Sequence, residues 1–487
     1  MAPGTPTLRL GAAGRLIPSG FLGLSMEFQA VPAYAGSDPR HVDPVLVRLI
    51  RALSPGQRPV IRIGGDSTDV SWVPAAGVRP PRFSGYTYPL TPSWLATTGA
   101  FARALHARMI LGLNLAADEP ALDAAEARAF SAAFGRSAIE AFELGNEPNL
   151  FATIPEWTLG NGTKVKARGH GYGPARYRRE VAAAVAALPG AQPPWSLAGP
   201  ALAASQDPAA AGVWKTGMAA FLRSEPAVRQ LTVHRYPLKN CFVAPHSPQD
   251  PTIPHLLAEY SSAGLADGVR VWIRIARAQG RTVRIDELNS VACRGKPGVS
   301  DTFASALWAT DALFSLASVG VGGVNIHTLP DAAYEPFAVS HAGGHWHVHV
   351  EPEYYGLRLF AQAAPAGSRL VPVLGAAHSV SLSAWATRAR DGTERLVLID
   401  KDPGHARTVR LALPAGARDR GVTVERLTAP SVAARGGVRL GGRTYGASTG
   451  TGALGTPRTT RARPARGGTV VVRVPGGSAA LVTFERR

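Results

Sequence analysis

The chain has 487 residues, of which 45% are hydrophobic and 18% are charged, and it carries a formal net charge of +18. This length exceeds a single ordinary core and suits a large barrel with a second domain. No apolar run approaches the length of a membrane span. The basic residues do not gather into a patch with interleaved aromatic residues, so neither a membrane nor a nucleic acid is expected as a partner.

Short apolar runs alternate with longer helical patterns from about residue 21 to residue 345, which is typical of parallel β/α units. Helices are predicted at 45–52, 92–108, 120–134, 176–188 and 301–318. Eight strands are predicted at 21–28, 60–63, 109–114, 141–144, 195–199, 231–236, 283–287 and 321–327. This pattern predicts an α/β fold, a (β/α)₈ TIM barrel, whose reactive groups lie at the carboxyl ends of the strands.

From about residue 352 the pattern changes to evenly spaced strands with alternating polarity and Gly/Pro turns, which predicts an appended C-terminal β-sandwich. A short helix at 354–364 precedes these strands, and the segment 7–10 is expected to add one more. The predicted strands are 370–374, 380–385, 395–400, 408–413, 422–427, 469–474 and 479–484. The predicted domains are therefore 17–350 for the catalytic barrel and 1–16 plus 351–487 for the sandwich.

Two glutamates stand at the ends of predicted barrel strands. Glu147 follows the fourth strand and is itself followed by Pro148, which cannot donate to a sheet ladder, and Glu287 ends the seventh strand. One such glutamate alone is an ordinary surface feature. A pair across one barrel mouth supplies what a retaining glycosidase needs, one protonated and one ionised carboxyl about 5–5.5 Å apart.

Neighbouring carboxyls leave alternatives open. Asp286 stands beside Glu287, and because successive strand residues face opposite ways, only one of the two is expected to reach the mouth. Glu143 lies on the same side of its strand as Glu147, deeper along it, and is kept as a reserve candidate.

The motifs resemble those of glycoside hydrolase family 79, the β-glucuronidase and heparanase-like family of a retaining clan. The matching stretches span nearly the whole chain: Arg62-Ile-Gly-Gly-Asp-Ser67, Gly145-Asn-Glu-Pro148, Asp286-Glu-Leu-Asn-Ser290, Asp301-Thr-Phe-Ala-Ser-Ala-Leu-Trp308 and Gly323-Val-Asn-Ile-His327. The resemblance implies a (β/α)₈ barrel with a β-sandwich, with Glu147 as general acid/base and Glu287 as nucleophile. It selects Glu287 over Asp286.

The resemblance also implies a set of substrate-binding residues. Asp66 and Asn146 would hold ring hydroxyls, Tyr236 would donate to Glu287, and Tyr334 would help to bind a substrate carboxylate. The full predicted set is Asp66, Ser67, Asn146, Tyr236, Arg294, His327 and Tyr334. Without the family, Asn146 is compatible with simple turn chemistry and Tyr236 with packing at the rim. Strand alternation also turns Asn146 the opposite way from Glu147 unless a bulge intervenes.

This sequence departs from the family in the loop after the seventh strand. An aromatic residue often expected there is absent, and Ala292, Cys293 and Arg294 stand in its place. Arg294 or Lys296 could supply the positive charge for a substrate carboxylate instead.

The predicted function is that of a retaining exo-acting β-glucuronidase, which hydrolyses terminal β-linked glucuronic acid or its 4-O-methyl form from glycans or glycosides. The alternatives are a neutral-sugar β-glycosidase of the same clan, an endo-acting heparanase-like enzyme and a non-catalytic glycan-binding barrel.

No cofactor is expected, because carboxyls supply both proton transfer and nucleophilic attack. A zinc site at His345, His347 and His349, which alternate along one strand face, is disfavoured for want of an evident supporting carboxylate.

Cys241 and Cys293 each lie just past a predicted barrel strand on the same rim. They are expected either as two buried free thiols or as a disulfide joining neighbouring loops, and a disulfide would indicate an oxidising compartment. The opening residues lack a signal-peptide pattern. A secreted protein whose leader is absent from this sequence is therefore expected, with a cytoplasmic location left open.

Overall fold

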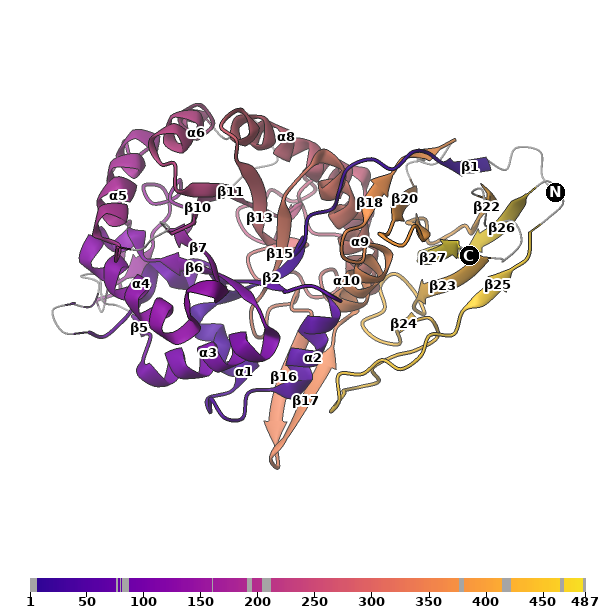
Figure 1. The fold of residues 1–487 in the computed structure, drawn as a ribbon, viewed down its shortest axis with the longest axis horizontal. Coiled ribbons are helices and arrows are strands. Elements are labelled where there is room, and N and C mark those ends of the chain that lie inside the picture. The colour runs from indigo at the N-terminus through magenta and orange to yellow at the C-terminus, as the bar shows by residue number, and fades with distance from the viewer. Residues whose placement is uncertain are drawn as a thin grey trace.

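The computed structural model describes residues 7–484 except 76–77, 79, 81–86, 160, 191–194, 204–211, 376–380, 414–421 and 465–467. Figure 1 shows a barrel of strands and helices beside a domain of strands alone. Among the described residues, no helix has the length and apolar character needed to cross a membrane.

Eight parallel strands close the barrel, in the order β10-β11-β13-β15-β2-β3-β6-β7. Their positions confirm the predicted strands and the fold class. In chain order they are β2 (Leu22–Glu27), β3 (Val60–Gly64), β6 (Arg108–Leu113), β7 (Ile139–Leu144), β10 (Leu197–Ala203), β11 (Val228–Arg235), β13 (Thr282–Leu288) and β15 (Gly323–Thr328).

Helices cover the outside of the barrel (Figure 1). The sequence indicates α2 clearly, because Asp43 accepts hydrogen bonds from the backbone N–H groups of Val45 and Leu46, and Pro44 occupies the first helical position. Of the principal helices, α6 and α8 were not predicted. The principal helices are α2 (Pro44–Ala52), α3 (Pro92–Leu105), α4 (Pro120–Phe134), α5 (Pro174–Ala187), α6 (Gly212–Ser224), α8 (Ala263–Ala278), α9 (Phe303–Val319) and α10 (Pro352–Ala363).

The second domain packs two sheets around its own apolar core, which includes Leu398, Leu411 and Val482. One sheet has the order β18-β20-β21-β27-β23-β24, and the other has the order β19-β1-β22-β26. The bounds are β1 (Thr7–Leu10), β18 (Arg369–Val371), β19 (Val373–Leu374), β20 (Leu382–Arg388), β21 (Glu394–Asp400), β22 (Arg407–Ala412), β23 (Val422–Thr428), β24 (Arg439–Leu440), β26 (Thr469–Val474) and β27 (Ser478–Phe484).

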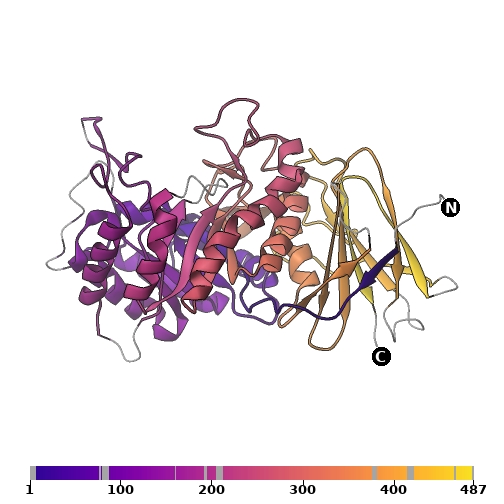
Figure 2. The same cartoon turned by 90° about the horizontal axis from the view of Figure 1, so that it is seen from above.

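Strand β1 pairs with β19 and β22, so the N-terminal end of the described chain lies in the second domain (Figure 2). Two short strands, β24 and β25 (Thr460–Ala462), were not predicted. Residue 380, the first of the predicted strand 380–385, lies outside the described residues. Residues 1–6 of the predicted segment 1–16 also lie outside them.

Helix α10 contacts both domains. The Tyr354 hydroxyl donates to the Leu49 carbonyl in α2, and the Tyr355 hydroxyl lies 3.2 Å from the Thr444 hydroxyl. The predicted boundary at residue 350 therefore stays a prediction.

A buried ion pair also joins the domains. Lys401, just past β21, lies 2.9 Å from Asp311 of α9, and Asp311 also accepts from Trp385 Nε1 at 2.7 Å. Both partners of the ion pair are almost fully buried, so this charge pair is part of the interdomain packing.

Two further segments follow barrel strands and lie beside one another at the barrel rim. The short helix α1 (Val31–Ala35) comes after β2, and the hairpin of β16 (Phe337–Ala342) and β17 (His345–Val350) comes after β15 (Figure 1). The Tyr34 hydroxyl bonds the Thr328 hydroxyl at 2.6 Å, and its ring meets Phe337 edge-on. These contacts fix both segments against the carboxyl end of β15.

Candidate active site

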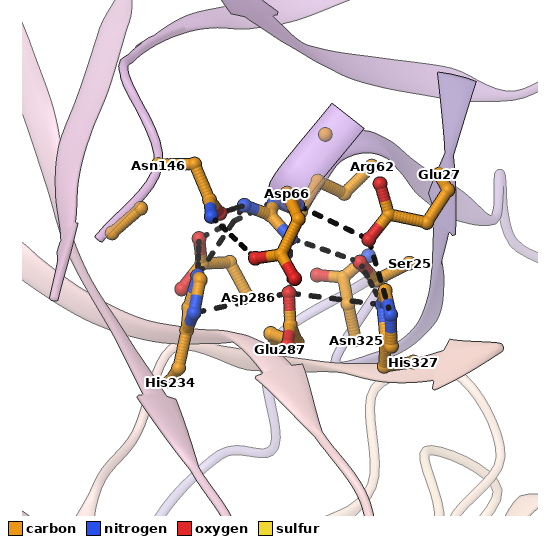
Figure 3. Close-up of polar contacts among 12 residues, drawn as sticks. Ser25, Glu27, Arg62, Asp66, Asn146, His234, Asp286, Glu287, Asn325 and His327 are labelled. Atoms are coloured by element: carbon orange, nitrogen blue, oxygen red, sulfur yellow. Dashed lines mark hydrogen bonds and ion pairs between the residues drawn. The ribbon is translucent and has the colours of Figure 1, made fainter. Parts of the chain in front are cut away.

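A fully buried arginine organises the carboxyl end of the barrel (Figure 3). Arg62, near the end of β3, donates from Nε to Glu143 at 2.6 Å and from Nη1 to Glu287 at 2.8 Å. Its Nη2 donates to the Asn146 side-chain oxygen at 3.0 Å. One guanidinium therefore fixes side chains from two other strands in a set geometry.

Glu287, on β13, lies at the bottom of the mouth with its side chain 12% exposed. Its second oxygen accepts from the Tyr236 hydroxyl at 2.8 Å, the contact that the family resemblance implied. Burial alone would raise the pKa of Glu287. Four neighbouring groups outweigh burial and hold this pKa well below its ordinary value: the side chains of His327, His234 and Arg62, and the Tyr236 hydroxyl. Glu287 is therefore an ionised carboxylate, as a nucleophile requires.

Glu147 lies just past β7, and its side chain is 24% exposed, twice as much as that of Glu287. Its φ of 43° is in the left-handed region, which is uncommon for a residue other than glycine. Its backbone N–H donates to the Ala201 carbonyl, and the Ala201 N–H donates to Thr232. The neighbouring strands β10 and β11 therefore hold this strained turn in place, as is common at functional sites.

His234, on β11, stands between the two glutamates. Its Nδ1 lies 2.8 Å from Glu147 Oε1 and 3.8 Å from Glu287 Oε2, and its Nε2 lies 3.5 Å from Asp286. Burial would lower the pKa of His234, but the Glu287 and Asp286 carboxylates outweigh burial and raise it well above its ordinary value. A protonated His234 offsets negative charge in the site.

Asp286 and Glu143 lie below the mouth. Both are fully buried, and Asp286 lies 3.5 Å from Arg62 Nε. The register of β13 shifts between Ile285 and Leu288, so Asp286 and Glu287 both contact Arg62 and do not face opposite ways as strict alternation predicted. Only Glu287 reaches the mouth.

The charges of these two buried carboxyls differ. Burial raises the pKa of Glu143 to about 8. For Asp286, burial acts in the same direction, but His234 and Arg62 outweigh it and lower its pKa to about 2. Glu143 is therefore a buried partner of Arg62, with no access to a substrate in the mouth.

Asp66 and Asn146 line the mouth beside Glu147. Asn146 turns its side chain into the site, where its amide nitrogen donates to Asp66 at 3.3 Å and its oxygen accepts from Arg62. Asp66 is exposed to solvent in this position. Both side chains are therefore placed where a ring hydroxyl could bind them, although the sequence alternation alone would have turned Asn146 away.

Ser67 lies inside the wall of the site and is 2% exposed. Its hydroxyl bonds the Glu27 carboxylate and accepts from the Phe28 N–H at 2.8 Å. The role of Ser67 as a substrate ligand therefore stays a prediction. Its polar atoms are used to hold Glu27, whose carboxylate also accepts from the Asp66 and Ser67 N–H groups.

Tyr334 and His327 form the wall on the side of β15. The Tyr334 ring lies 6.3 Å from Tyr236 and 5.9 Å from His327, centroid to centroid. Burial lowers the pKa of His327 to about 4, so this imidazole is neutral at pH 7 and carries the charge that favours ionised Glu287 only in acid. Its Nδ1 lies 3.1 Å from the Ser25 hydroxyl. Arg294 is exposed at the rim above Tyr334 and donates to the Pro330 carbonyl at 3.0 Å.

The two cysteines form a disulfide, with Cα atoms 6.1 Å apart. They follow β12 (Leu238–Lys239) and β14 (Val291–Ala292), which pair with one another at the rim. Asn240 extends this junction, because its side chain donates to the Gly295 carbonyl at 3.0 Å. The loops after β11 and β13 are thereby joined next to Tyr236 and Arg294.

The three alternating histidines lie on β17, away from the residues above. His345 and His347 are exposed, and His349 lies 3.3 Å from Glu351, a carboxylate that the sequence analysis overlooked. Within the described part of the chain, no group of three or more His, Cys, Asp or Glu side chains is arranged to hold a metal ion.

Sequence reasoning did not single out His234, Glu27 or the central role of Arg62. His234 had a usable signal, because it stands two positions before Tyr236 on one strand and therefore shares its side. Arg62 had one as well, since a charged residue between Ile61 and Ile63 on a buried strand requires partners.

Comparisons with known proteins agree with this geometry. Residues 384–481 match the family model described as the glycosyl hydrolase family 79 C-terminal beta domain. A beta-glucuronidase from Neurospora crassa is 24% identical over 436 residues, which cover 78% of this chain and 71% of that protein.

Solved structures show the same fold. A 4-O-alpha-L-rhamnosyl-beta-D-glucuronidase from Fusarium oxysporum superposes with a TM-score of 0.73 at 20% identity, covering 98% of this chain and all of that one. A family 51 arabinofuranosidase from Xanthomonas axonopodis has a TM-score of 0.66 at 16% identity, covering 99% of this chain and all of that one.

Taken with these relatives, the (β/α)₈ barrel with two strand-end glutamates and an attached β-sandwich identifies the chain as a glycoside hydrolase. The matched C-terminal domain and the beta-glucuronidase relative support glycoside hydrolase family 79, the family that the sequence motifs resemble.

Proposed function

We propose that this enzyme is a retaining, exo-acting β-glucuronidase that removes terminal β-linked glucuronic acid, or its 4-O-methyl form, from glycans or glycosides. The observation that carries the proposal is the pairing of Glu147 and Glu287 across His234 at the barrel mouth. The named activities of the Neurospora and Fusarium relatives support the choice of sugar.

The separation of the two glutamates supports retention. Glu147 Oε1 lies 2.8 Å and Glu287 Oε2 lies 3.8 Å from His234 Nδ1. The separation of these two carboxylate oxygens therefore cannot exceed the sum of the two distances. That limit reaches only the lower end of the roughly 6.5–9.5 Å that inverting enzymes need to accommodate a water. Double displacement is the mechanism that fits this spacing.

In the first step, Glu287 attacks the anomeric carbon while Glu147 protonates the leaving oxygen. The bond from the anomeric carbon to the leaving group breaks as a covalent ester to Glu287 forms. In the second step, Glu147 removes a proton from water while the water oxygen attacks the anomeric carbon. The ester bond to Glu287 breaks, which releases the sugar and regenerates the Glu287 carboxylate. The Tyr236 and Arg62 donors keep Glu287 ionised before attack.

The uronic-acid preference rests on Tyr334 and Arg294. A carboxylate at sugar C6 could accept charge-assisted hydrogen bonds there that a hydroxymethyl group cannot match, each worth roughly 1.5–3 kcal/mol. We expect nitrophenyl β-glucuronide to exceed the β-glucoside by about 100-fold or more in kcat/KM. Equal rates on the two at low salt would contradict the uronic-acid assignment and leave the two-glutamate mechanism standing.

A pair of matched variants makes this test specific. Tyr334→Phe should shrink the ratio of glucuronide to glucoside activity. Tyr236→Phe, which removes a hydroxyl from the neighbouring ring but acts on Glu287, should lower both activities by the same factor. Hydrolysis of an internally substituted glucuronic acid polymer, with long fragments released first, would contradict exo action.

We also propose that the protein is exported, because the Cys241–Cys293 disulfide is typical of oxidising compartments. The test is detection of the enzyme in the culture medium of its source. Its confinement to the cytosol with both thiols free would contradict this proposal.

A further inference from the structure

A second hollow lies outside the catalytic mouth, between the chain that follows α1 and the hairpin β16–β17. We call it the rim groove. It has a volume of about 810 Å³, a size typical of ligand-binding clefts, and its lining includes Gly36, Asp38, Arg40, His41, His341 and Trp346. Figure 1 shows α1 and the hairpin side by side. Both segments follow strands that carry site residues, Glu27 on β2 and His327 on β15.

One wall of the rim groove is aromatic. His341 and Trp346 are direct partners across the hairpin, and their rings stack with centroids 4.3 Å apart and planes 29° apart. The His341 side of the stack is exposed, and Trp346 is half-buried. Stacked flat rings at a groove wall suit the C–H face of a pyranose, since such rings offer an amphipathic surface at low entropic cost.

The opposite wall requires a glycine. Gly36 has a φ of 87°, which disfavours any side chain, and a Cβ there would lie 3.0 Å from the Trp346 ring. The backbone can therefore approach the edge of the indole, and the groove stays open beside it. A smaller hollow of about 320 Å³ continues on the other side of this turn and shares Pro32, Gly36 and Ser37 with the rim groove.

The mouth of the groove is polar. Asp38 accepts from Arg40 Nε at 3.3 Å and lies 2.8 Å from His41 Nδ1, which orients both basic side chains. The side chains of Arg40 and His41 are 82% and 75% exposed. Of the ionisable residues that line the groove, Asp38 is acidic, whereas Arg40, His41 and His341 are basic or neutral. This balance favours a ligand that carries carboxylates.

We propose that the rim groove is a secondary binding site for an acidic glycan, which it holds by stacking a sugar ring on His341 and Trp346 and by pairing a carboxylate with Arg40. The proposal rests on the proposed uronic-acid function of the catalytic site. A chain held here raises the effective concentration of its other ends at the catalytic mouth, so the groove increases activity on long glycans and not on small glycosides.

The test compares a decasaccharide of alternating glucuronic acid and N-acetylglucosamine with nitrophenyl β-glucuronide. Trp346→Ala and Arg40→Glu should each lower kcat/KM for the decasaccharide by about tenfold and leave the nitrophenyl substrate within twofold of wild type. Arg270→Glu is the matched control, because Arg270 is also an exposed arginine paired with a nearby aspartate. Unchanged decasaccharide kinetics in both groove variants would overturn the proposal.

Two further arms separate the possible failures. Direct binding of the decasaccharide to the Glu287→Gln protein, with and without Arg40→Glu, measures the groove without turnover, so it decides the proposal even if the enzyme fails to cleave glucuronides. Arg40→Glu should weaken this binding about tenfold. A neutral xylan decasaccharide that binds equally tightly, with equal sensitivity to Arg40→Glu, would overturn the acidic-glycan assignment.

Discussion

His234 Nδ1 lies 2.8 Å from Glu147 Oε1, so one imidazole from the sixth barrel strand directly contacts the proposed general acid/base. The same ring faces Asp286 and Glu287, whose charges keep it protonated. The site therefore contains two fixed cations, Arg62 and His234, among four carboxyls that lie within 4 Å of them.

This arrangement predicts a pH-dependent contribution to stability. Because the pKa of folded His234 is raised above its unfolded value, its stabilising effect is complete below about pH 6.5 and is lost as the pH rises through the raised folded pKa. His234→Asn should therefore lower Tm most below pH 6.5, and the difference from wild type should narrow at alkaline pH. Thermal melts between pH 5.5 and 10 measure this.

The exposed His405, which pairs with Asp402 at the surface, provides the control. His405→Asn should change Tm by little at any of these pH values, since exposed ion pairs contribute little. A His234→Asn difference that stays constant, or widens, toward alkaline pH would refute the assignment of a protonated His234.

Replacing the general acid should affect substrates unequally. Glu147→Gln should lower kcat/KM for an alkyl glucuronide by roughly 10²–10⁴-fold, because its leaving group needs a proton. Nitrophenyl glucuronide should be much less affected in the step that forms the covalent intermediate. Pre-steady-state kinetics separate the two steps, and equal losses on both substrates would mean that Glu147 is not the acid.

The Tyr236 hydroxyl should assist catalysis through Glu287. Tyr236→Phe removes a hydrogen bond to a charged group, worth roughly 1.5–3 kcal/mol, so kcat should fall about 10- to 100-fold. Far-UV circular dichroism checks that the barrel is intact. An unchanged kcat for this variant would show that the hydroxyl only packs at the rim.

The ion pair between Lys401 and Asp311 should stabilise the junction of the two domains. Lys401→Met leaves Asp311 buried without its cation and should cost about 3–5 kcal/mol of unfolding free energy. Asp311→Asn with Lys401→Met should recover part of that loss, because no buried charge remains. Denaturant titration of the single and double variants tests this, and a double variant less stable than both singles would count against it.

The periodicity of the sequence was sufficient to predict the barrel and most strands of the sandwich. The strands of the barrel are short apolar runs with clear polar ends, so the local sequence preference agrees with the strand that the tertiary structure requires. The two missed helices gave weak signals in the sequence. Helix α6 contains Gly212 and Gly217, which lower helix propensity, and α8 follows a long proline-containing loop that gave no clear start.

The site was harder to predict, because its geometry depends on irregular backbone. Alternation along a strand placed Asn146 away from the mouth and set Asp286 opposite Glu287. The left-handed turn at Gly145 and Glu147 and the register shift in β13 reverse both expectations. The hydrogen bond from the Ser67 hydroxyl to Glu27, 40 residues earlier, was not predicted, because the motif around Ser67 does not reveal this partner.

Trapping the covalent intermediate tests most directly whether Glu287 is the nucleophile of a retaining glucuronidase. Incubation with 2-deoxy-2-fluoro-β-glucuronyl fluoride should slow the second step and trap the sugar, and peptide mapping by mass spectrometry should then find it on Glu287. Glu287→Gln should retain its fold and carry no label. A label on Glu147 or Asp286, or complete turnover that releases the α-anomer first, would show that Glu287 is not the nucleophile of a retaining enzyme.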